Sequence, residues 1–230
     1  MDDSLDALRR DVITCHRCPR LVAHRERVAS EKKRAFRDEP YWGKPVPGFG
    51  DPYARVLLIG LAPAAHGANR TGRMFTGDVP GGAADFLIAA LYRAGFANQS
   101  TSHHADDGLE LTDTYLTAIA RCAPPKNRPT SEEIDQCAEY LDREFALLTH
   151  VRAIVALGGM AFDQTLRLLH RFGASIPSSK PRFAHGAVLE LDGMPSVIAA
   201  YHPSRQNTQT GRLTPEMLDE VFAAVRARLV

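Results

Sequence analysis

The feature that most constrains the fold is an alternation of short, wholly apolar segments with longer amphipathic ones. The apolar runs lie at 56–61, 115–120, 153–157 and 196–200, with a shorter candidate strand at 188–191. The amphipathic segments between them have apolar residues at helical spacing, at 83–94, 130–148, 161–172 and 214–229. Strands that are apolar on both faces are typical of parallel sheets covered by helices. The pattern predicts an α/β fold: a three-layer α/β/α sandwich with a central, mainly parallel four-stranded sheet.

The length of the chain and the sequence of its N-terminus define the expected domain and location. A chain of 230 residues can bury one substantial core, so we expect a single domain over 1–230 with an N-terminal arm at 1–50. Residues 30–52 and 98–112 are expected to be surface loops. The N-terminus lacks the pattern of a secretory signal, and no stretch approaches the roughly 20 apolar residues of a membrane span. We therefore expect a cytoplasmic protein with no membrane partner.

The charges are distributed unevenly although the net charge is only +1. Residues 9–37 hold ten lysines and arginines against three acidic residues, whereas 106–113 is acidic. A basic segment of this kind can be the footprint of a nucleic-acid-binding protein. It is equally typical of a solvated helical face, and charge alone leaves both interpretations open.

Four cysteines form a second candidate feature: Cys15, Cys18, Cys122 and Cys137. A reducing compartment argues against a disulfide framework. The C-x2-C spacing of Cys15 and Cys18 lets two thiolates from one turn bind one metal centre, and four thiolates could complete a structural zinc site or a cubane iron–sulfur cluster. Spacing does not choose between these metals. Alternatively, Cys137 is a core residue of its helix and Cys122 a loop thiol.

Two loops follow expected strands and can carry chemistry, because ligands bind beyond the carboxyl ends of the strands in such sheets. The loop from Gly60 to Asp78 has small residues that allow close approach of a ligand to the backbone. It could be a phosphate-binding turn, but it has the glycine spacing of neither the dinucleotide fingerprint nor the Walker loop. The second loop, 201–207, places His202 directly after a strand, where it can be a hydrogen-bond donor or a structural residue.

Six segments in one order along most of the chain carry a resemblance to a known family: Cys15–Cys18, Tyr41–Asp51, Gly60–Asp78, Arg121–Arg128, Cys137 and His202–Arg205. Together they resemble the uracil-DNA glycosylase superfamily, specifically its family 5, the type B enzymes that carry a four-iron four-sulfur cluster. The resemblance implies that the four cysteines hold this cluster, with structural zinc as the alternative. It also implies that DNA containing uracil or other deaminated bases is the partner.

Cleavage of an N-glycosidic bond builds positive charge on the sugar and negative charge on the leaving base. Asp78 suits the first charge. His202, with backbone amides near Ala64, Ala65 and His66, suits the second. The resemblance implies that Phe75 stacks on the flipped base and that Asn127 helps to hold the water.

The DNA contacts expected outside the pocket come from two groups of residues. Ser204 and Arg205 are expected to enter the minor groove behind the extruded base. Further arginines are expected to contact phosphate: Arg17, Arg20, Arg70 and Arg73.

The chain departs from the related family 4 enzymes at two positions. Family 4 has an acidic residue where this chain has Leu61, and an asparagine that reads uracil where it has Ala118. Loss of a buried amide should loosen discrimination, so we expect hypoxanthine, xanthine or ethenocytosine to be accepted beside uracil.

No lysine stands in the two catalytic motifs to form a Schiff base, so the expected reaction is monofunctional hydrolysis that leaves an abasic site. We expect a monomer that acts on the bacterial nucleoid. The alternatives are a nucleoside or nucleotide hydrolase on a doubly wound sheet and a non-catalytic DNA-damage binding module.

Overall fold

The computed structural model describes residues 3–77, 81–179 and 181–229. A six-stranded sheet with the order β1-β3-β2-β4-β6-β5 forms its centre. The strands are β1 (Phe49–Gly50), β2 (Val56–Gly60), β3 (Thr114–Ala118), β4 (Ala153–Leu157), β5 (Val188–Leu189) and β6 (Ser196–Ala200). The four central strands are parallel, as predicted, and β1 and β5 pair antiparallel at the two edges. The sheet therefore has two short strands more than the four expected. Of these, β1 has only two residues and no sequence pattern that marks it.

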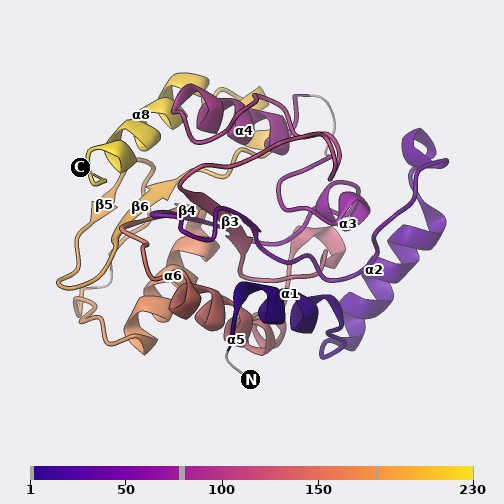
Figure 1. The fold of residues 1–230 in the computed structure, drawn as a ribbon, viewed down its shortest axis with the longest axis horizontal. Coiled ribbons are helices and arrows are strands. Elements are labelled where there is room, and N and C mark those ends of the chain that lie inside the picture. Colours follow the sequence, from indigo (N-terminus) through magenta and orange to yellow (C-terminus); the bar gives the residue numbers. More distant parts are fainter. Residues whose placement is uncertain (1–2, 78–80, 180, 230) are drawn as a thin grey trace.

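Helices cover both faces of the sheet and make the three layers (Figure 1). They are α1 (Leu5–Ile13), α2 (Pro19–Glu31), α3 (Ala68–Thr71), α4 (Ala83–Arg93), α5 (Ser131–Leu147), α6 (Gly159–Arg171), α7 (Arg205–Gln209) and α8 (Pro215–Arg226), with 3-10 turns η1 (Arg34–Phe36) and η2 (Pro125–Asn127). Helices α4 and α8 pack together on one face, α5 and α6 cover the other, and α1 packs on α5.

Each central strand is buried on both faces, which explains its mostly apolar sequence. In β2, Val56 and Leu58 belong to the core beneath α4 and α8, whereas Leu57 and Ile59 belong to the core beneath α5 and α6. Successive side chains of a strand point to opposite faces, so a strand covered on both sides is mostly apolar. A buried polar residue such as Thr117 in β3 is accommodated by its hydrogen bond to Glu144.

The predicted helix ends are confirmed by their hydrogen bonds. The Thr130 hydroxyl accepts the N–H of Glu133 at 3.3 Å, and the Glu133 carboxylate accepts the N–H of Thr130 at 2.8 Å, which is the capping box. Thr214 likewise caps α8 by accepting the N–H of Met217 at 3.3 Å. These polar side chains satisfy backbone donors that the first helical turn leaves without partners.

The two expected surface loops are more deeply packed than predicted. Residues 45–48 are buried, and the N–H of Val46 donates to the carbonyl of Arg121 at 2.7 Å. In the second loop, Ser102, Leu109 and Leu111 are buried. Neither loop has a regular period, so its burial depends on tertiary contacts that local sequence does not show. None of the helices within the described ranges is long and apolar enough to cross a membrane.

A buried ion pair joins the end of β3 to α5. Arg121 and Glu144 are 1% and 2% exposed in their side chains, and the guanidinium Nη2 lies 2.5 Å from the carboxylate Oε2. The Thr117 hydroxyl donates to the same carboxylate oxygen at 2.6 Å. Charges this deeply buried are tolerated only when they are paired and hydrogen bonded.

We expect Glu144→Gln to lower the free energy of unfolding by about 3–5 kcal/mol, because it leaves the buried Arg121 charge uncompensated. Glu139→Gln on the same helix is the matched control. This substitution removes an ion pair with Arg17 on the surface, where the Arg17 and Glu139 side chains are 42% and 53% exposed. It should lower the free energy of unfolding by at most about 1 kcal/mol. Urea denaturation of both variants is the measurement, and equal losses would contradict the expectation.

Candidate active site

A small cavity of about 70 Å³ lies at the carboxyl ends of β2, β3 and β6. This is the edge of a parallel sheet where ligands bind in folds of this class. Its lining is predominantly apolar: Gly60, Ala62, Pro63, Ala64, Gly67, Ala68, Met74, Phe75, Thr76, Ala83, Ala84, Ala118 and His202. The loop after Gly60 supplies most of these residues, so the structure gathers one wall of the cavity from a single loop.

Phe75 forms one side of this cavity, as its position in the loop predicted. Its backbone has a φ of +49°, a conformation that bulky residues rarely adopt. A Cβ on Gly60 would lie 2.9 Å from the Phe75 ring, so the absence of a side chain at Gly60 lets the ring pack over the end of β2. The ring centroid of Phe75 lies 6.4 Å from that of His202, which also lines the cavity.

His202 reaches the cavity because β6 ends at Ala200 and the chain turns at once into α7. The His202 carbonyl accepts the N–H of Ser204 at 2.7 Å and the side-chain amide of Asn207 at 2.8 Å. Ser204 is also the N-cap of α7. These bonds hold the backbone on which the imidazole is mounted, which is the positioning that a fixed hydrogen-bond donor requires.

A larger groove of about 490 Å³ lies beside the cavity, and the two share Ala62, Ala64, Ala83 and His202. Besides the shared Ala64 and His202, five predicted site residues line this groove but not the cavity: Ala65, His66, Asn127, Ser204 and Arg205. Asn127 therefore lines the groove and not the cavity. It follows Lys126, and both have left-handed backbone conformations, with φ of +54° and +55°. Strained backbone of this kind clusters at functional sites.

The groove also contains residues that the sequence analysis missed. Lys33 and Phe36, from the segment that follows α2, form part of its wall. The Tyr41 hydroxyl lies 3.0 Å from His66 Nδ1 and accepts the backbone N–H of Lys33, which joins this segment to the loop after β2. Only the basic character of 9–37 hinted at such a role. Asp78 lies outside the described residues, so its predicted place beside the sugar remains a prediction.

Two arginines expected to contact phosphate are buried instead. Arg70 is 5% exposed, pairs with Glu39 and donates to the Gly77 carbonyl at 2.5 Å. Arg73 is 6% exposed and pairs with Asp107 at 2.7 Å. Both guanidinium groups hold loops together inside the protein, and a loop sequence alone does not distinguish such an arginine from one on the surface.

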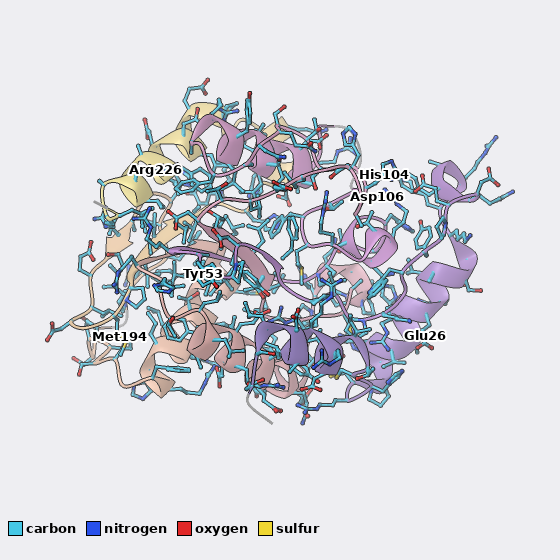
Figure 2. All side chains as sticks on the ribbon, viewed as in Figure 1. Glu26, Tyr53, His104, Asp106, Met194 and Arg226 are labelled. Atoms are coloured by element: carbon cyan, nitrogen blue, oxygen red, sulfur yellow. The ribbon has the colours of Figure 1, made fainter. Side chains whose placement is uncertain are left out.

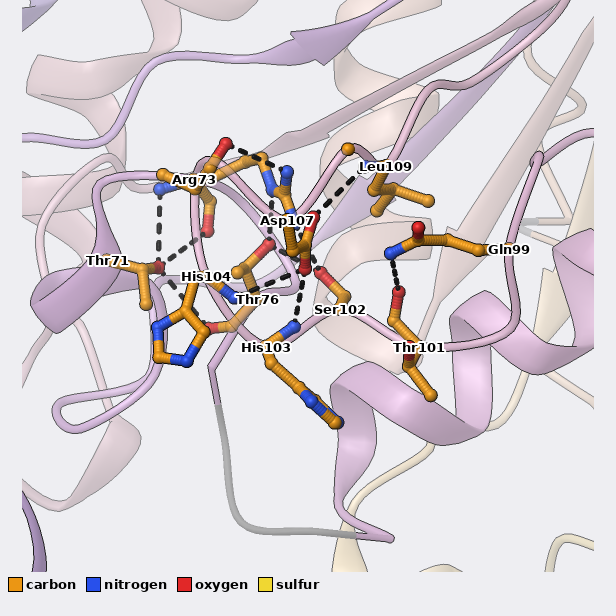
Figure 3. Close-up of polar contacts among 12 residues, drawn as sticks. Thr71, Arg73, Thr76, Gln99, Thr101, Ser102, His103, His104, Asp107 and Leu109 are labelled. Carbon is orange, nitrogen blue, oxygen red and sulfur yellow. Dashed lines mark hydrogen bonds and ion pairs between the residues drawn. The ribbon is translucent and has the colours of Figure 1, made fainter.

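Asp107 is the centre of a polar network that supports the end of the loop after β2 (Figure 3). Its carboxylate accepts the guanidinium of Arg73 and the backbone N–H groups of His103, His104 and Leu109. Arg73 also donates to the hydroxyls of Thr76 and Ser102.

The network acts on the segment that carries Phe75 and leads to Asp78. The N–H of Gly77 donates to the carbonyl of Ser102 at 2.8 Å, so the residue before Asp78 is bonded directly to the second loop. A site residue on a loop needs such support to keep its geometry.

The four cysteines come from different parts of the chain. Cys15 lies between α1 and α2, Cys18 is the N-cap of α2, Cys122 follows β3 and Cys137 lies in α5. All four are free thiols, and Cys15 packs against the small buried cluster that contains Cys137. Burial raises the pKa of Cys18 to about 11 and that of Cys122 to about 12, and nearby cysteines contribute to both shifts. Within the described ranges, no three cysteine, histidine, aspartate or glutamate side chains are arranged to hold a single metal ion.

Comparison with known proteins identifies the family. The family model of the uracil DNA glycosylase superfamily matches residues 47–226. This chain belongs to that superfamily. It is 54% identical over 212 residues to a type-5 uracil-DNA glycosylase of Mycobacterium tuberculosis, which covers 92% of this chain and 76% of the relative. It is 53% identical to type-5 uracil-DNA glycosylases of Mycobacterium leprae (95% of this chain, 93% of the relative) and Thermus thermophilus (94% of each).

The superfamily match begins after the N-terminal segment. Cys15, Cys18, Lys33 and Phe36 lie before residue 47, whereas the cavity residues lie within the matched range. The similarity to the type-5 relatives spans most of the chain. It therefore extends to the N-terminal segment, which holds two of the four cysteines and one wall of the groove.

The Asp107 network has a testable dependence on pH. Burial alone would raise the pKa of Asp107, but the Arg73 guanidinium and three backbone N–H groups outweigh it and hold this pKa below its usual range. A carboxylate with a lowered folded-state pKa stabilises the protein above its unfolded pKa of about 4, and this stabilisation is lost as the pH falls through the folded value.

We expect Asp107→Asn to lower the free energy of unfolding by about 1.5–3 kcal/mol at neutral pH, because it removes a charge-assisted pair. The difference between wild type and variant should shrink as the pH falls below about 4. Urea denaturation across this range measures it, with Asp106→Asn as the exposed control. A difference that stays constant as the pH falls would contradict the role of the Asp107 charge.

Proposed function

We propose that this protein is a uracil-DNA glycosylase that hydrolyses the N-glycosidic bond of a uracil flipped out of DNA. The observation that carries the proposal is the small, predominantly apolar cavity lined by His202 and Phe75, beside a groove lined by Lys33 and Arg205. The cavity suits a planar base, and the basic groove suits the phosphates of a polymer. The names of the type-5 relatives support the same activity.

The reaction needs one group for each charge that develops. Water adds through its oxygen to C1′ and gives up a proton while the C1′–N bond breaks. The electron pair of that bond leaves with the base, which then takes up a proton. We assign His202 and the backbone near Ala64 to the negative charge on the base oxygen. Asp78 is assigned to the positive charge on the sugar, and Asn127, at the groove, to the water. None of the described cavity residues is a lysine, which supports release of the base without strand cleavage.

The groove distinguishes this proposal from the two alternatives. A nucleoside or nucleotide hydrolase needs the cavity but has no use for a neighbouring groove lined by Lys33 and Arg205. A DNA-damage binding module needs the groove but gains nothing from a histidine fixed by two hydrogen bonds to its carbonyl. The combination favours an enzyme that acts on DNA.

A duplex with a single uracil tests the activity. We expect wild type to produce strand breaks only after alkali, and His202→Ala to lose about 10²–10³-fold in kcat because a preorganised donor is removed. His170→Ala, on the surface of α6, is the matched control and should retain full activity. Absence of alkali-labile sites with wild type, or hydrolysis of free deoxyuridine alone, would overturn the proposal.

We also propose a broad range of bases, including hypoxanthine, xanthine and ethenocytosine. Ala118 lines the cavity with a methyl group and offers no amide to the edge of a base. A cavity without such a donor and acceptor pair has little means of rejecting other bases.

A side-chain amide at position 118 should narrow the range of bases that the enzyme excises. We expect Ala118→Asn to raise the ratio of kcat/KM for uracil over that for hypoxanthine by at least about tenfold, because the amide would be left unpaired by the wrong base. Single-turnover excision from matched duplexes measures the ratio. An unchanged ratio would show that Ala118 does not control the range, and Ala83→Ser at the cavity rim provides the control for a general change in the cavity.

For the cofactor, we propose that Cys15, Cys18, Cys122 and Cys137 hold a four-iron four-sulfur cluster, with structural zinc as the alternative. The chemistry of the donor set fits, because four thiols that form no disulfide interact electrostatically with one another and the Cys122 sulfur accepts a hydrogen bond from the buried Arg25. The described side chains do not by themselves form a site for a single metal ion. When bound, the group would link the N-terminal segment to β3 and α5. Hydrolysis requires no redox step from it.

We propose that the protein acts as a monomer on the DNA of the nucleoid, in the bacterial cytoplasm. The bacterial origin of the closely similar relatives supports the setting.

A further inference from the structure

Four arginines are buried among the described residues, and three of them share one arrangement. Arg70, Arg73 and Arg121 each pair with a carboxylate on a different segment: Glu39, Asp107 and Glu144. The fourth, Arg25, is 1% exposed and does not follow this rule.

Arg25 points into the cysteine region. Its Nη1 donates to the Cys15 carbonyl at 3.2 Å and to the Cys122 sulfur at 3.1 Å. Its nearest carboxylate is that of Glu26, 3.6 Å from Nη2, and the Glu26 side chain is 56% exposed on the outer side of α2 (Figure 2). The Nε of Arg25 has no hydrogen-bond partner.

A guanidinium in this position is costly unless an anion lies beside it. Burial of a charge without a partner is among the largest destabilising effects in a protein, and a neutral thiol does not compensate it. A metal centre with four thiolate ligands carries net negative charge, whether its metal is zinc or a cubane of iron. The only sulfur within hydrogen-bond distance of Arg25 in the described structure is that of Cys122, one of the proposed ligands.

We propose that Arg25 is the internal counter-charge of the thiolate-ligated centre. It neutralises part of the charge that the four cysteines bring together, and it donates to the sulfur of Cys122. The inference rests on the proposed cofactor. It concerns a residue outside the four ligands and gives the first helical segments a defined electrostatic role.

The same residue joins the cysteine region to the cavity. The side-chain amide of Asn69 donates to the carbonyl of Arg25 at 3.3 Å and to that of Ala65 at 3.4 Å. The N–H of Asn69 donates to the carbonyl of Ala64, which lines the cavity. Arg25 thus contacts a proposed ligand with its side chain and the cavity loop with its backbone.

Replacement of Arg25 tests the counter-charge. We expect Arg25→Met, which keeps an apolar stem, to release metal to a chelator about 10- to 100-fold faster than wild type, the usual effect of losing a partner of a metal ligand. Arg25→Lys keeps the charge, so its rate of metal release should lie between those of wild type and Arg25→Met. Arg27→Met, an exposed position on the same helix, is the matched control and should match wild type. The readouts are metal analysis and the visible absorbance of anaerobically purified protein.

A second measurement separates the counter-charge from a packing role. Arg25→Met should lower the free energy of unfolding of the metal-loaded protein, yet leave the chelator-stripped protein unchanged or more stable, because it removes a buried cation that is paired only with the exposed Glu26 carboxylate at 3.6 Å. Equal destabilisation of both forms, or metal release at the wild-type rate, would overturn the proposal. So would a wild-type chain that contains neither iron nor zinc. Uracil release by the same preparations reports separately on the proposed activity.

Discussion

The burial of four parallel strands on both faces is the constraint on which the rest of the structure depends. A strand covered on both sides is mostly apolar, and a parallel neighbour is reached by a crossover connection, which is usually a helix. The connections therefore leave the sheet at one edge. Ile59 and Gly60, Ala118 and Ala200 end three of the strands at this edge, and the cavity forms where their loops meet.

Buried arginines organise the loops that the sheet leaves without regular structure. Arg70 and Arg73 each connect the loop after β2 to a segment distant in the sequence, and Arg121 connects the end of β3 to α5. A guanidinium has five donors in a fixed plane, so one side chain can bond several carbonyls and a carboxylate at once. In the same way, the Arg25 guanidinium contacts the Cys15 carbonyl, the Cys122 sulfur and the Glu26 carboxylate.

Periodicity predicted most of the fold. The central strands and the helices α4, α5, α6 and α8 fall within a few residues of their expected bounds, because burial of one or both faces leaves a direct record in the pattern of apolar residues. The edge strand β1 and the packed segment 45–48 leave no such record. The depth of residues 98–112 was missed for the same reason, since Asp107 holds them through polar contacts.

The site was predicted in part. Motifs pointed to Phe75, His202 and the loop after Gly60, which the structure brings to one cavity. They did not show that Asn127 lies in the neighbouring groove, or that Lys33 and Phe36 form its wall. Such relations join separate segments of the chain, and local patterns carry no information about them.

By itself the sequence determined the alternating α/β architecture and the chemical types of the candidate groups, because hydrophobic period and residue chemistry are local properties. Only the tertiary structure decided which arginines are exposed to a ligand and which are internal. Arg70 and Arg73 lie within a loop that reads as a phosphate site, yet their charges pair with Glu39 and Asp107. The partner of a charge is set by the path of the whole chain, which brings distant segments together, and not by its neighbours in sequence.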